Sequence, residues 1–454
     1  MRNQFLQFSM TRKKSRKPKI HLQPAEELVP REDWFAFFNK VCGDVHAELE
    51  STSFSNGYRH DDQKFWDAII YGVLNGKPLK DGSDQLNDLL YKQLGKERQC
   101  IDGTRMRYER LVPNAQQINA FLRKIPEAFL WKFRVALLKA QVNRALEMGL
   151  ITKIIEVYID FHKVDYYGGD RRETNAGITN VNDGRGTNRA RKYGNVMISS
   201  GYVSLFSGVV LTKQGAGKEA WIGELLLMLR FWGFTIKRVY ADREFSTYDV
   251  LALLDMLDVP YTGSMKRTWG MRKLIDKYLD GECKAVVLYR VAPNQGTRLD
   301  IGLIPVHVIF KMDTGTSIFA VRKALKDGTM TRAEARKKVH VFITTEQEPA
   351  ISTKLISWGM SVIEGFRRRW RIETGFRDDK KFSPMSHARR NSIKTFKVGL
   401  GHFGYNGWRI QCGLYKRLQR VPTTWREGET RERFGTVATT MHVENYTAHG
   451  TPIA

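Results

Sequence analysis

The hydrophobic period of the 454-residue chain changes near Lys153, and this change constrains the fold more than any other feature. Before Lys153 apolar residues recur at helical spacing, whereas the run IIEVYIDF that follows alternates and is rich in β-branched residues, which predicts a strand ending at Asp160. The run TIKRVYAD predicts another strand, which ends at Asp242. Two strand-like runs and an amphipathic helix occupy 195–232. We therefore expect a mixed α/β sheet with two acids at the carboxyl ends of strands, where functional groups of such sheets gather.

Residues 24–150 are expected to form an all-helical, DNA-binding region. In the segment NAQQINAFLRKIP an apolar stripe recurs at helical spacing, Pro126 ends the helix, and a second helix follows directly to about Met148. Two helices around a tight break fit a helix-turn-helix that reads a major groove, but this stretch alone favours an ordinary helical bundle. The sequence of this region leaves both interpretations open.

The charge of the chain indicates a polyanionic partner. It carries 74 Lys+Arg against 48 Asp+Glu, a net charge of +26. Nucleic acid is the first candidate, because phosphate neutralisation releases counterions and drives binding without regard to sequence. Residues 1–23 contain no acid and predict a basic disordered arm, although a localisation signal would have the same composition.

Several other classes are disfavoured. The most apolar stretch, 196–211, is too short for a bilayer and is interrupted by glycines and serines, so no membrane partner is expected. The first ten residues lack the apolar core of a signal peptide, which favours a cytoplasmic protein. The four cysteines form no CxxC pair, which argues against a zinc or disulfide framework.

The second half of the chain divides at about residue 350. The runs KAVVLYRVA, LDIGLIPVHVIFKM, SIFAV and VHVFITT predict a β-rich insertion over 268–350. It interrupts an α/β core whose first part is 151–267 and whose final helices are 351–420. Residues 421–454 are a C-terminal tail.

A third acid lies in the basic segment GFRRRWRIETGFRDDKKF, which contains no proline and predicts one helix. At about 100° per residue, four side chains fall within an arc of roughly 60°; they are Phe366, Arg369, Glu373 and Lys380. A glutamate among cations can simply form i,i+4 ion pairs on a solvated face. Such a face, however, needs no alignment of an aromatic ring, a guanidinium, a carboxylate and an ammonium.

This spacing resembles the Y-x2-R-x3-E-x6-K signature of insertion-sequence transposases of the IS-four type. Those are DDE enzymes with an RNase H-like catalytic core, a mixed-sheet α/β fold. The resemblance extends from Lys153 to about Trp408: YID at Asp160 is similar to the first acid of the family, ADREF at Asp242 to the second, and Glu373 to the third. The insertion between the second and third acids is also where that family carries one.

The resemblance implies a function and a site. Asp160, Asp242 and Glu373 would hold two Mg²⁺ (or Mn²⁺) ions, catalysing hydrolysis at the terminal inverted repeats and strand transfer to target DNA. Arg369 and Lys380 would hold phosphates, and Arg243, next to Asp242, is a further candidate that can equally pair with its neighbouring glutamate. A homodimer on two double-stranded DNA ends and a prokaryotic, nucleoid-associated location are also implied.

One position departs from the signature, because Phe366 replaces its tyrosine and lacks the hydroxyl. This change puts the fine positioning of DNA in doubt and leaves the three acids untouched. Two alternatives remain: an RNase H-like structure-selective nuclease, and a domesticated DNA-binding protein that no longer cuts. The long basic N-terminal region and the insertion argue against a minimal nuclease, and the intact acids argue against a binder that has lost cleavage.

Overall fold

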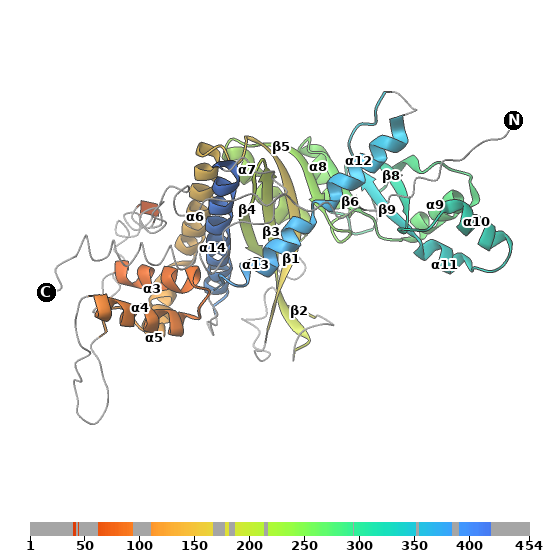
Figure 1. Ribbon diagram of the computed structural model, residues 1–454. Helices are drawn as coiled ribbons and strands as arrows, with labels where there is room; N and C mark the ends of the chain where they lie inside the picture. Colours follow the sequence, from red (N-terminus) through yellow and green to blue (C-terminus); the bar gives the residue numbers. More distant parts are fainter. Residues whose placement is uncertain are drawn as a thin grey trace.

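The computed structural model describes residues 40–41, 44, 62–93, 110–166, 178–180, 187–212, 217–293, 295–350, 354–383 and 390–418. The expected N-terminal arm (1–23) and C-terminal tail (421–454) lie outside these ranges. Within them every helix is too short or too polar to span a bilayer. The described chain combines helices with a mixed sheet, which confirms the predicted mixed α/β fold (Figure 1).

The N-terminal helices form a bundle that shares its core with the last helix of the chain. The helices are α3 (Asp62–Leu74), α4 (Leu79–Gln93), α5 (Ala115–Lys124) and α6 (Glu127–Glu147). The apolar stripe of α5 points inward, and Phe121 stacks on Phe65 with ring centroids 4.5 Å apart. Helix α14 (Asn391–Leu418) runs beside α6 (Figure 1). The helical region expected over 24–150 is thus joined to the core, and its role in DNA binding stays a prediction.

The core sheet is assembled from strands that are distant in sequence. Its strands are β1 (Ile154–Asp165), β2 (Ile178–Asn180), β3 (Arg189–Ser200), β4 (Val203–Leu211), β5 (Thr235–Ala241) and β6 (Tyr261–Ser264). Strand β1 is parallel to β5 and antiparallel to β3, and β5 is parallel to β6. The prediction that the first strand ends at Asp160 was wrong, because β1 continues to Asp165 by pairing with β3.

Helices cover both faces of this sheet. Successive residues of a strand point to opposite faces. A side chain at Gly194 would meet Trp221 of α7 (Lys218–Phe231), whereas Asn195 contacts His402 of α14. Helix α7 therefore packs on one face, and α14 packs on the other.

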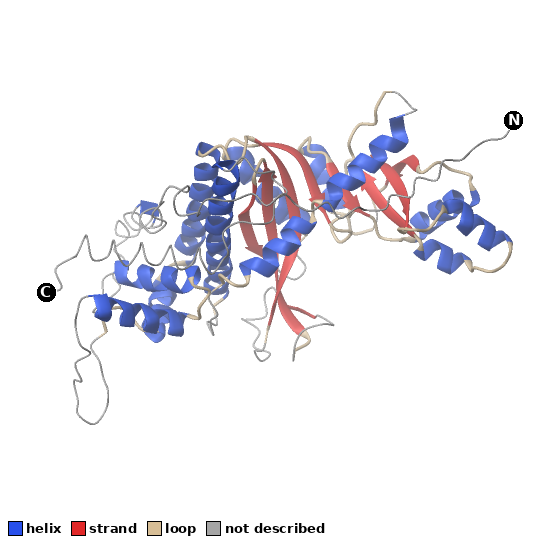
Figure 2. Cartoon of the chain, viewed as in Figure 1, coloured by secondary structure: helices blue, strands red, loops and turns tan. Residues whose placement is uncertain are grey.

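The insertion is not the β-rich block that its apolar runs predicted. Residues 268–350 contain helices α9 (Trp269–Asp280), α10 (Ile318–Lys326) and α11 (Arg332–Lys337) beside strands β7 (Val286–Val291), β8 (Ile304–Met312) and β9 (Val339–Thr344) (Figure 2). The run SIFAV begins α10, because the Ser317 side chain accepts a hydrogen bond from the Phe319 amide and so caps a helix.

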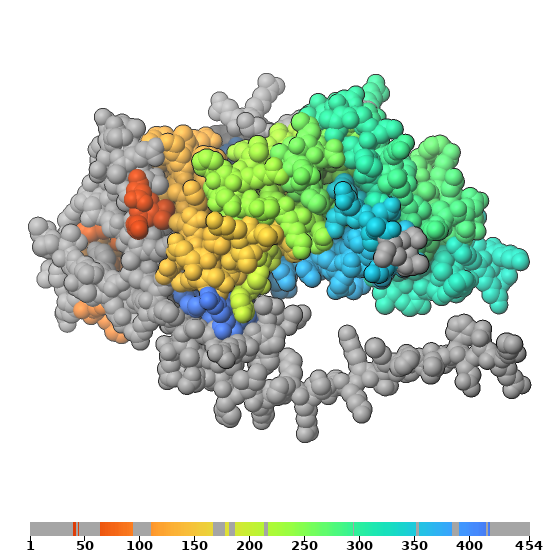
Figure 3. Space-filling model, turned by 90° about the horizontal axis from the view of Figure 1, so that it is seen from above, coloured from red at the N-terminus to blue at the C-terminus, as the bar shows by residue number. Residues whose placement is uncertain are grey.

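The insertion extends the core sheet instead of forming a sheet of its own. Strand β9 pairs with β6, which gives the order β2-β3-β1-β5-β6-β9-β8-β7, with β4 on β3. Seen from above, the insertion (green to cyan) adjoins the core without a gap in the described surface (Figure 3). The basic segment after it is also not the single helix that was expected. Helix α12 (Leu355–Arg367) ends before α13 (Trp370–Asp379), with Arg368 and Arg369 in a turn between them.

Candidate active site

Asp160 and Asp242 lie side by side because their strands are parallel and in register. Ile159 of β1 pairs with Ala241 of β5, and each acid is the next residue of its strand or loop. The Asp160 carboxylate accepts a 2.8 Å hydrogen bond from the Phe161 amide. Both carboxylates are partly buried. The two predicted acids therefore lie at the same level of neighbouring strands, although only Asp242 follows the end of its strand.

Glu373 belongs to α13, which packs on β1 and brings this side chain close to Asp160. The link is Arg369, whose guanidinium lies 3.0 Å from Asp160 Oδ2 and 2.6 Å from Glu373 Oε1. Arg369 is only 8% exposed, so these ion pairs are shielded from solvent. The structure thus brings the predicted third acid to the first two through a buried arginine.

The electrostatics of Asp160 indicate that the acids share one site. Burial raises the pKa of Asp160 to about 6, the Arg369 charge opposes this rise, and the charges of Asp242 and Glu373 add to it. Like charges this close disfavour simultaneous ionisation unless a cation compensates them. In this structure Arg369 is a compensating cation.

The donor chemistry of these acids fits a hard divalent cation, because carboxylate oxygens are preferred ligands of Mg²⁺. Over the described ranges, however, no three His, Cys, Asp or Glu side chains are arranged to hold a metal ion. Asp160 and Glu373 face the Arg369 guanidinium, and Asp242 Oδ1 accepts hydrogen bonds from the Arg243 amide and the Ser264 hydroxyl. The residue types suit the metal, while the carboxylates here are held by protein groups.

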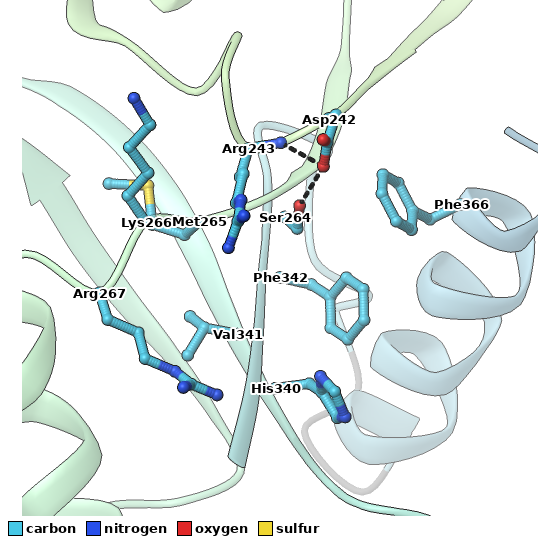
Figure 4. A pocket seen from close by; sticks show the side chains of 10 residues that line it. All are labelled: Asp242, Arg243, Ser264, Met265, Lys266, Arg267, His340, Val341, Phe342 and Phe366. Atoms are coloured by element: carbon cyan, nitrogen blue, oxygen red, sulfur yellow. Dashed lines mark hydrogen bonds between the residues drawn. The ribbon is translucent and has the colours of Figure 1, made fainter. Parts of the chain in front are cut away.

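A cavity of about 790 Å³ opens beside Asp242, between β6, β9 and α12; we name it the Asp242 groove (Figure 4). Its lining combines cations with an aromatic pair: Asp242, Arg243, Ser264, Met265, Lys266, Arg267, His340, Val341, Phe342 and Phe366. Phe342 and Phe366 meet edge to face at 5.4 Å. Such a basic groove with exposed ring surface suits a nucleic-acid strand.

Two basic side chains of the groove, Arg267 and His340, are held in place by contacts with residues of the insertion. The Arg267 guanidinium donates hydrogen bonds to the carbonyls of Lys337 and Val339, the latter at 2.9 Å. His340 lies 2.6 Å from Asp313. The sequence analysis did not predict that the insertion helps to form the groove. The basic run SMKR at the end of a short strand was the one signal that pointed to it.

The remaining predicted residues occupy different positions. Arg243 is exposed, and its side chain extends toward the middle of the groove residues (Figure 4). Phe366 lies near the end of α12, with the Arg369 guanidinium 5.5 Å from its ring centre. Lys380 caps α13 at its C-terminal end and is exposed; it does not line the groove. The helix break after Arg367 therefore removes the predicted common helical face, although Arg369 still lies beside both the Phe366 ring and Glu373.

A chain of buried polar side chains lies behind this site, and no motif in the sequence predicted it. His402 of α14 contacts Asp379 Oδ1 at 2.9 Å and Asn195 Oδ1 at 2.7 Å. Asn195 lies directly opposite Asp160 in the β1–β3 ladder. All three side chains of the chain are fully buried. The chain ties α13, α14 and β3 together behind the strand that carries Asp160.

The comparisons with known proteins do not assign this chain to a family, so its function has to be inferred from the site. No family model matches the chain, and no curated protein matches it. A cryo-EM structure of the piggyBac transposase synaptic complex with hairpin DNA aligns over 95% of this chain and 82% of that chain, with a TM-score of 0.46 and 8% identity. A similarity this low transfers neither a fold nor an activity to the present protein.

Proposed function

We propose that this protein is a DDE-type DNA transposase that hydrolyses phosphodiesters at element ends and joins the freed ends to target DNA. The observation that carries the proposal is the meeting of Asp160, Asp242 and Glu373 beside a basic groove. The strand order β4-β3-β1-β5-β6, with β3 antiparallel to β1 and the last three strands parallel, supports an RNase H-like core. The Y-x2-R-x3-E-x6-K resemblance supports the insertion-sequence type.

The three carboxylates would hold two Mg²⁺ or Mn²⁺ ions. When bound, such ions lower the pKa of an attacking water and stabilise charge on the leaving oxygen. The first reaction forms a bond between water oxygen and phosphorus and breaks the bond from phosphorus to the 3′ oxygen, which takes up a proton. In the second, that 3′-hydroxyl attacks a phosphodiester of the target and displaces a target 3′ oxygen.

The protein's own residues prepare this chemistry in three ways. The Arg369 charge keeps Asp160 and Glu373 together without a metal, so the site does not have to assemble from separated acids. Ser264 and the Arg243 amide fix the orientation of Asp242. Arg243 and Lys266 present positive charge along the groove, where they would hold the phosphates of a strand.

Cleavage of DNA tests the proposal. The substrate is a supercoiled plasmid that carries the repeats flanking the gene, incubated with Mg²⁺ and either wild type or Glu373→Gln. Glu364→Gln is the matched control, because Glu364 is an exposed residue of α12 that pairs with Arg367. We expect repeat-dependent nicking by wild type and the control, and none by Glu373→Gln, with repeat binding retained in a gel-shift assay.

Two outcomes would contradict the proposal. Tight repeat binding without cutting by any of the proteins would favour the domesticated DNA-binding protein. Cutting that ignores the repeats would favour the structure-selective nuclease, and cutting that survives Glu373→Gln would remove Glu373 from the catalytic set.

A further inference from the structure

Helix α13 is held on the sheet by polar contacts at both of its ends. At the N-terminal end, the Arg369 guanidinium lies 3.0 Å from Asp160 of β1. At the C-terminal end, Asp379 contacts His402 of α14 at 2.9 Å, and His402 contacts Asn195 of β3 at 2.7 Å. We name Asp379, His402 and Asn195 the His402 network, and all three side chains are fully buried. The helix is therefore fixed at two points, one on each side of the third predicted acid.

The two fixed points belong to one closed ring of contacts. Asn195 lies directly opposite Asp160 in the β1–β3 ladder, so both side chains leave the sheet on the same face. Over this face the ring runs through the ladder pair, the hydrogen bonds of the His402 network, α13 and the ion pair; its side chains are Asp160, Asn195, His402, Asp379 and Arg369. Glu373 lies on α13 between the two fixed ends, so the ring sets its position relative to Asp160.

The hydrogen bonds of the His402 network fix the orientation of its imidazole ring. The Asn195 amide nitrogen donates to the Tyr193 carbonyl at 3.0 Å, so the amide oxygen faces His402 Nε2. Because an amide oxygen only accepts, Nε2 carries a proton. His402 Nδ1 and the Asp379 carboxyl group then share one further proton, which joins them by a hydrogen bond whichever of the two atoms holds it.

The packing around the network does not by itself define the angle of α13 about its own axis. The Phe376 ring of α13 stacks on His162 at 4.9 Å and on Phe206 at 5.5 Å, and Phe206 stacks on His402 at 3.9 Å. Burial of these rings favours a close approach of α13 to the sheet, but the hydrophobic effect is non-directional. A hydrogen bond weakens steeply as its angle becomes unfavourable, so the bond between Asp379 and His402 selects one angle of the helix.

We propose that the His402 network positions Glu373 beside Asp160 while Arg369 gives way to a divalent cation between the acids. Release of Arg369 removes the ion pairs at the N-terminal end of α13. The bonds at the other end involve neither the three acids nor Arg369, so they persist and keep the helix on the sheet. The exchange of Arg369 for a cation rests on the proposed function, whereas the hold of the network on α13 does not.

Hydrogen exchange in EDTA tests the hold on α13 without metal or DNA. Asp379→Leu keeps the shape of the side chain and removes its bond to His402. Asp379→Asn is the matched variant, because its amide N–H can donate to Nδ1 of a neutral imidazole and so retains a bond. We expect the amides of α13 to exchange about tenfold faster in Asp379→Leu than in wild type, and those of Asp379→Asn to stay close to wild type.

Val308→Ala controls for a general loss of stability. Val308 is a buried residue of β8 in the insertion, and its truncation should leave the exchange of α13 amides unchanged. Wild-type exchange of α13 in Asp379→Leu would overturn the proposal, and so would an equal acceleration by Asp379→Leu and Asp379→Asn. If Asp379→Leu does not fold, Asn195→Ala opens the same ring at β3 and is expected to accelerate the exchange of α13 in the same way.

The affinity of the folded protein for Mn²⁺ separates positioning from a merely structural role. Electron paramagnetic resonance of free Mn²⁺ gives the Kd at a temperature where every variant is folded, so a loss of stability alone leaves the Kd unchanged. We expect Asp379→Leu to raise the Kd about tenfold and Asp379→Asn to keep it near the wild-type value, because contacts that orient metal ligands have effects of this size. Unchanged Mn²⁺ affinity in Asp379→Leu would overturn the proposal. If wild type binds no Mn²⁺, the proposed function fails, while hydrogen exchange still decides whether the network holds α13.

Discussion

Replacing Arg369 with glutamine tests whether the arginine stands in for a metal ion between the acids. The change removes a guanidinium that contacts Asp160 at 3.0 Å and Glu373 at 2.6 Å in a buried position. Removing one partner of a buried ion pair costs about 3–5 kcal/mol. Asp160, whose pKa is already raised to about 6, can take up a proton, which favours the lower end of that range. With an m value of about 3 kcal/mol/M, the urea midpoint falls by roughly 1 M.

Added Mg²⁺ should restore most of the free energy of unfolding that Arg369→Gln loses. A ligand at 100 times its Kd stabilises the folded state by about 2.7 kcal/mol. In wild type the same ion must first displace Arg369 from two carboxylates, so the gain in the free energy of unfolding is smaller. Urea unfolding at pH 8, with and without Mg²⁺, measures both gains.

Arg368→Gln is the matched control for this experiment. Arg368 neighbours Arg369 but is 53% exposed and lies 3.5 Å from Glu156, so its loss should cost about 1 kcal/mol or less. Its Mg²⁺ response should equal that of wild type. If Mg²⁺ stabilises Arg369→Gln no more than wild type, the acids do not exchange the arginine for a metal, and the reasoning is refuted.

Three further changes probe the supporting structure. Lys397→Met should raise the free energy of unfolding below pH 7 by on the order of 5 kcal/mol at most, because the pKa of Lys397 is about 7 in the folded chain and 10.5 in the unfolded chain. A lowered lysine pKa destabilises the folded state below pH 7, and this destabilisation disappears as the pH rises toward 10.5. Urea unfolding at pH 6 and pH 10 measures the effect, and equal gains at both pH values would contradict it. Gly375→Ala should lower the free energy of unfolding by about 1–3 kcal/mol and reduce cleavage, because the new Cβ would lie 2.5 Å from Met197 and push α13 off the sheet. Unchanged cleavage by a destabilised protein would show that catalysis does not depend on this packing. His402→Ala should cost about 1–3 kcal/mol in thermal unfolding, because it removes a buried hydrogen-bond partner of both Asp379 and Asn195. A near-neutral result would show that these contacts do not stabilise the fold.

The sequence anticipated the parts of this protein that depend on local pattern. Alternating apolar runs placed the strands that carry Asp160 and Asp242, because a half-buried strand imposes that period on its own residues. The third acid followed from spacing along one segment. These features need no knowledge of distant contacts.

Features set by distant contacts were missed. No glycine or proline marks the break at Arg368 and Arg369, where the chain turns so that Arg369 meets Asp160, some 200 residues earlier. The short run SIFAV has the composition of a strand, and only its cap at Ser317 favours a helix. The ion pairs of Arg369 with Asp160 and Glu373 were not expected either, and the predicted phosphate contact of Arg369 stays a prediction.

The pairing of β6 with β9 has a mechanical consequence. Ser264, which pairs with Phe342 across this junction, also donates the hydrogen bond that orients Asp242. Strand β6, which is four residues long, therefore connects the insertion directly to the residue that orients Asp242, so a displacement of β9 would be transmitted to that carboxylate.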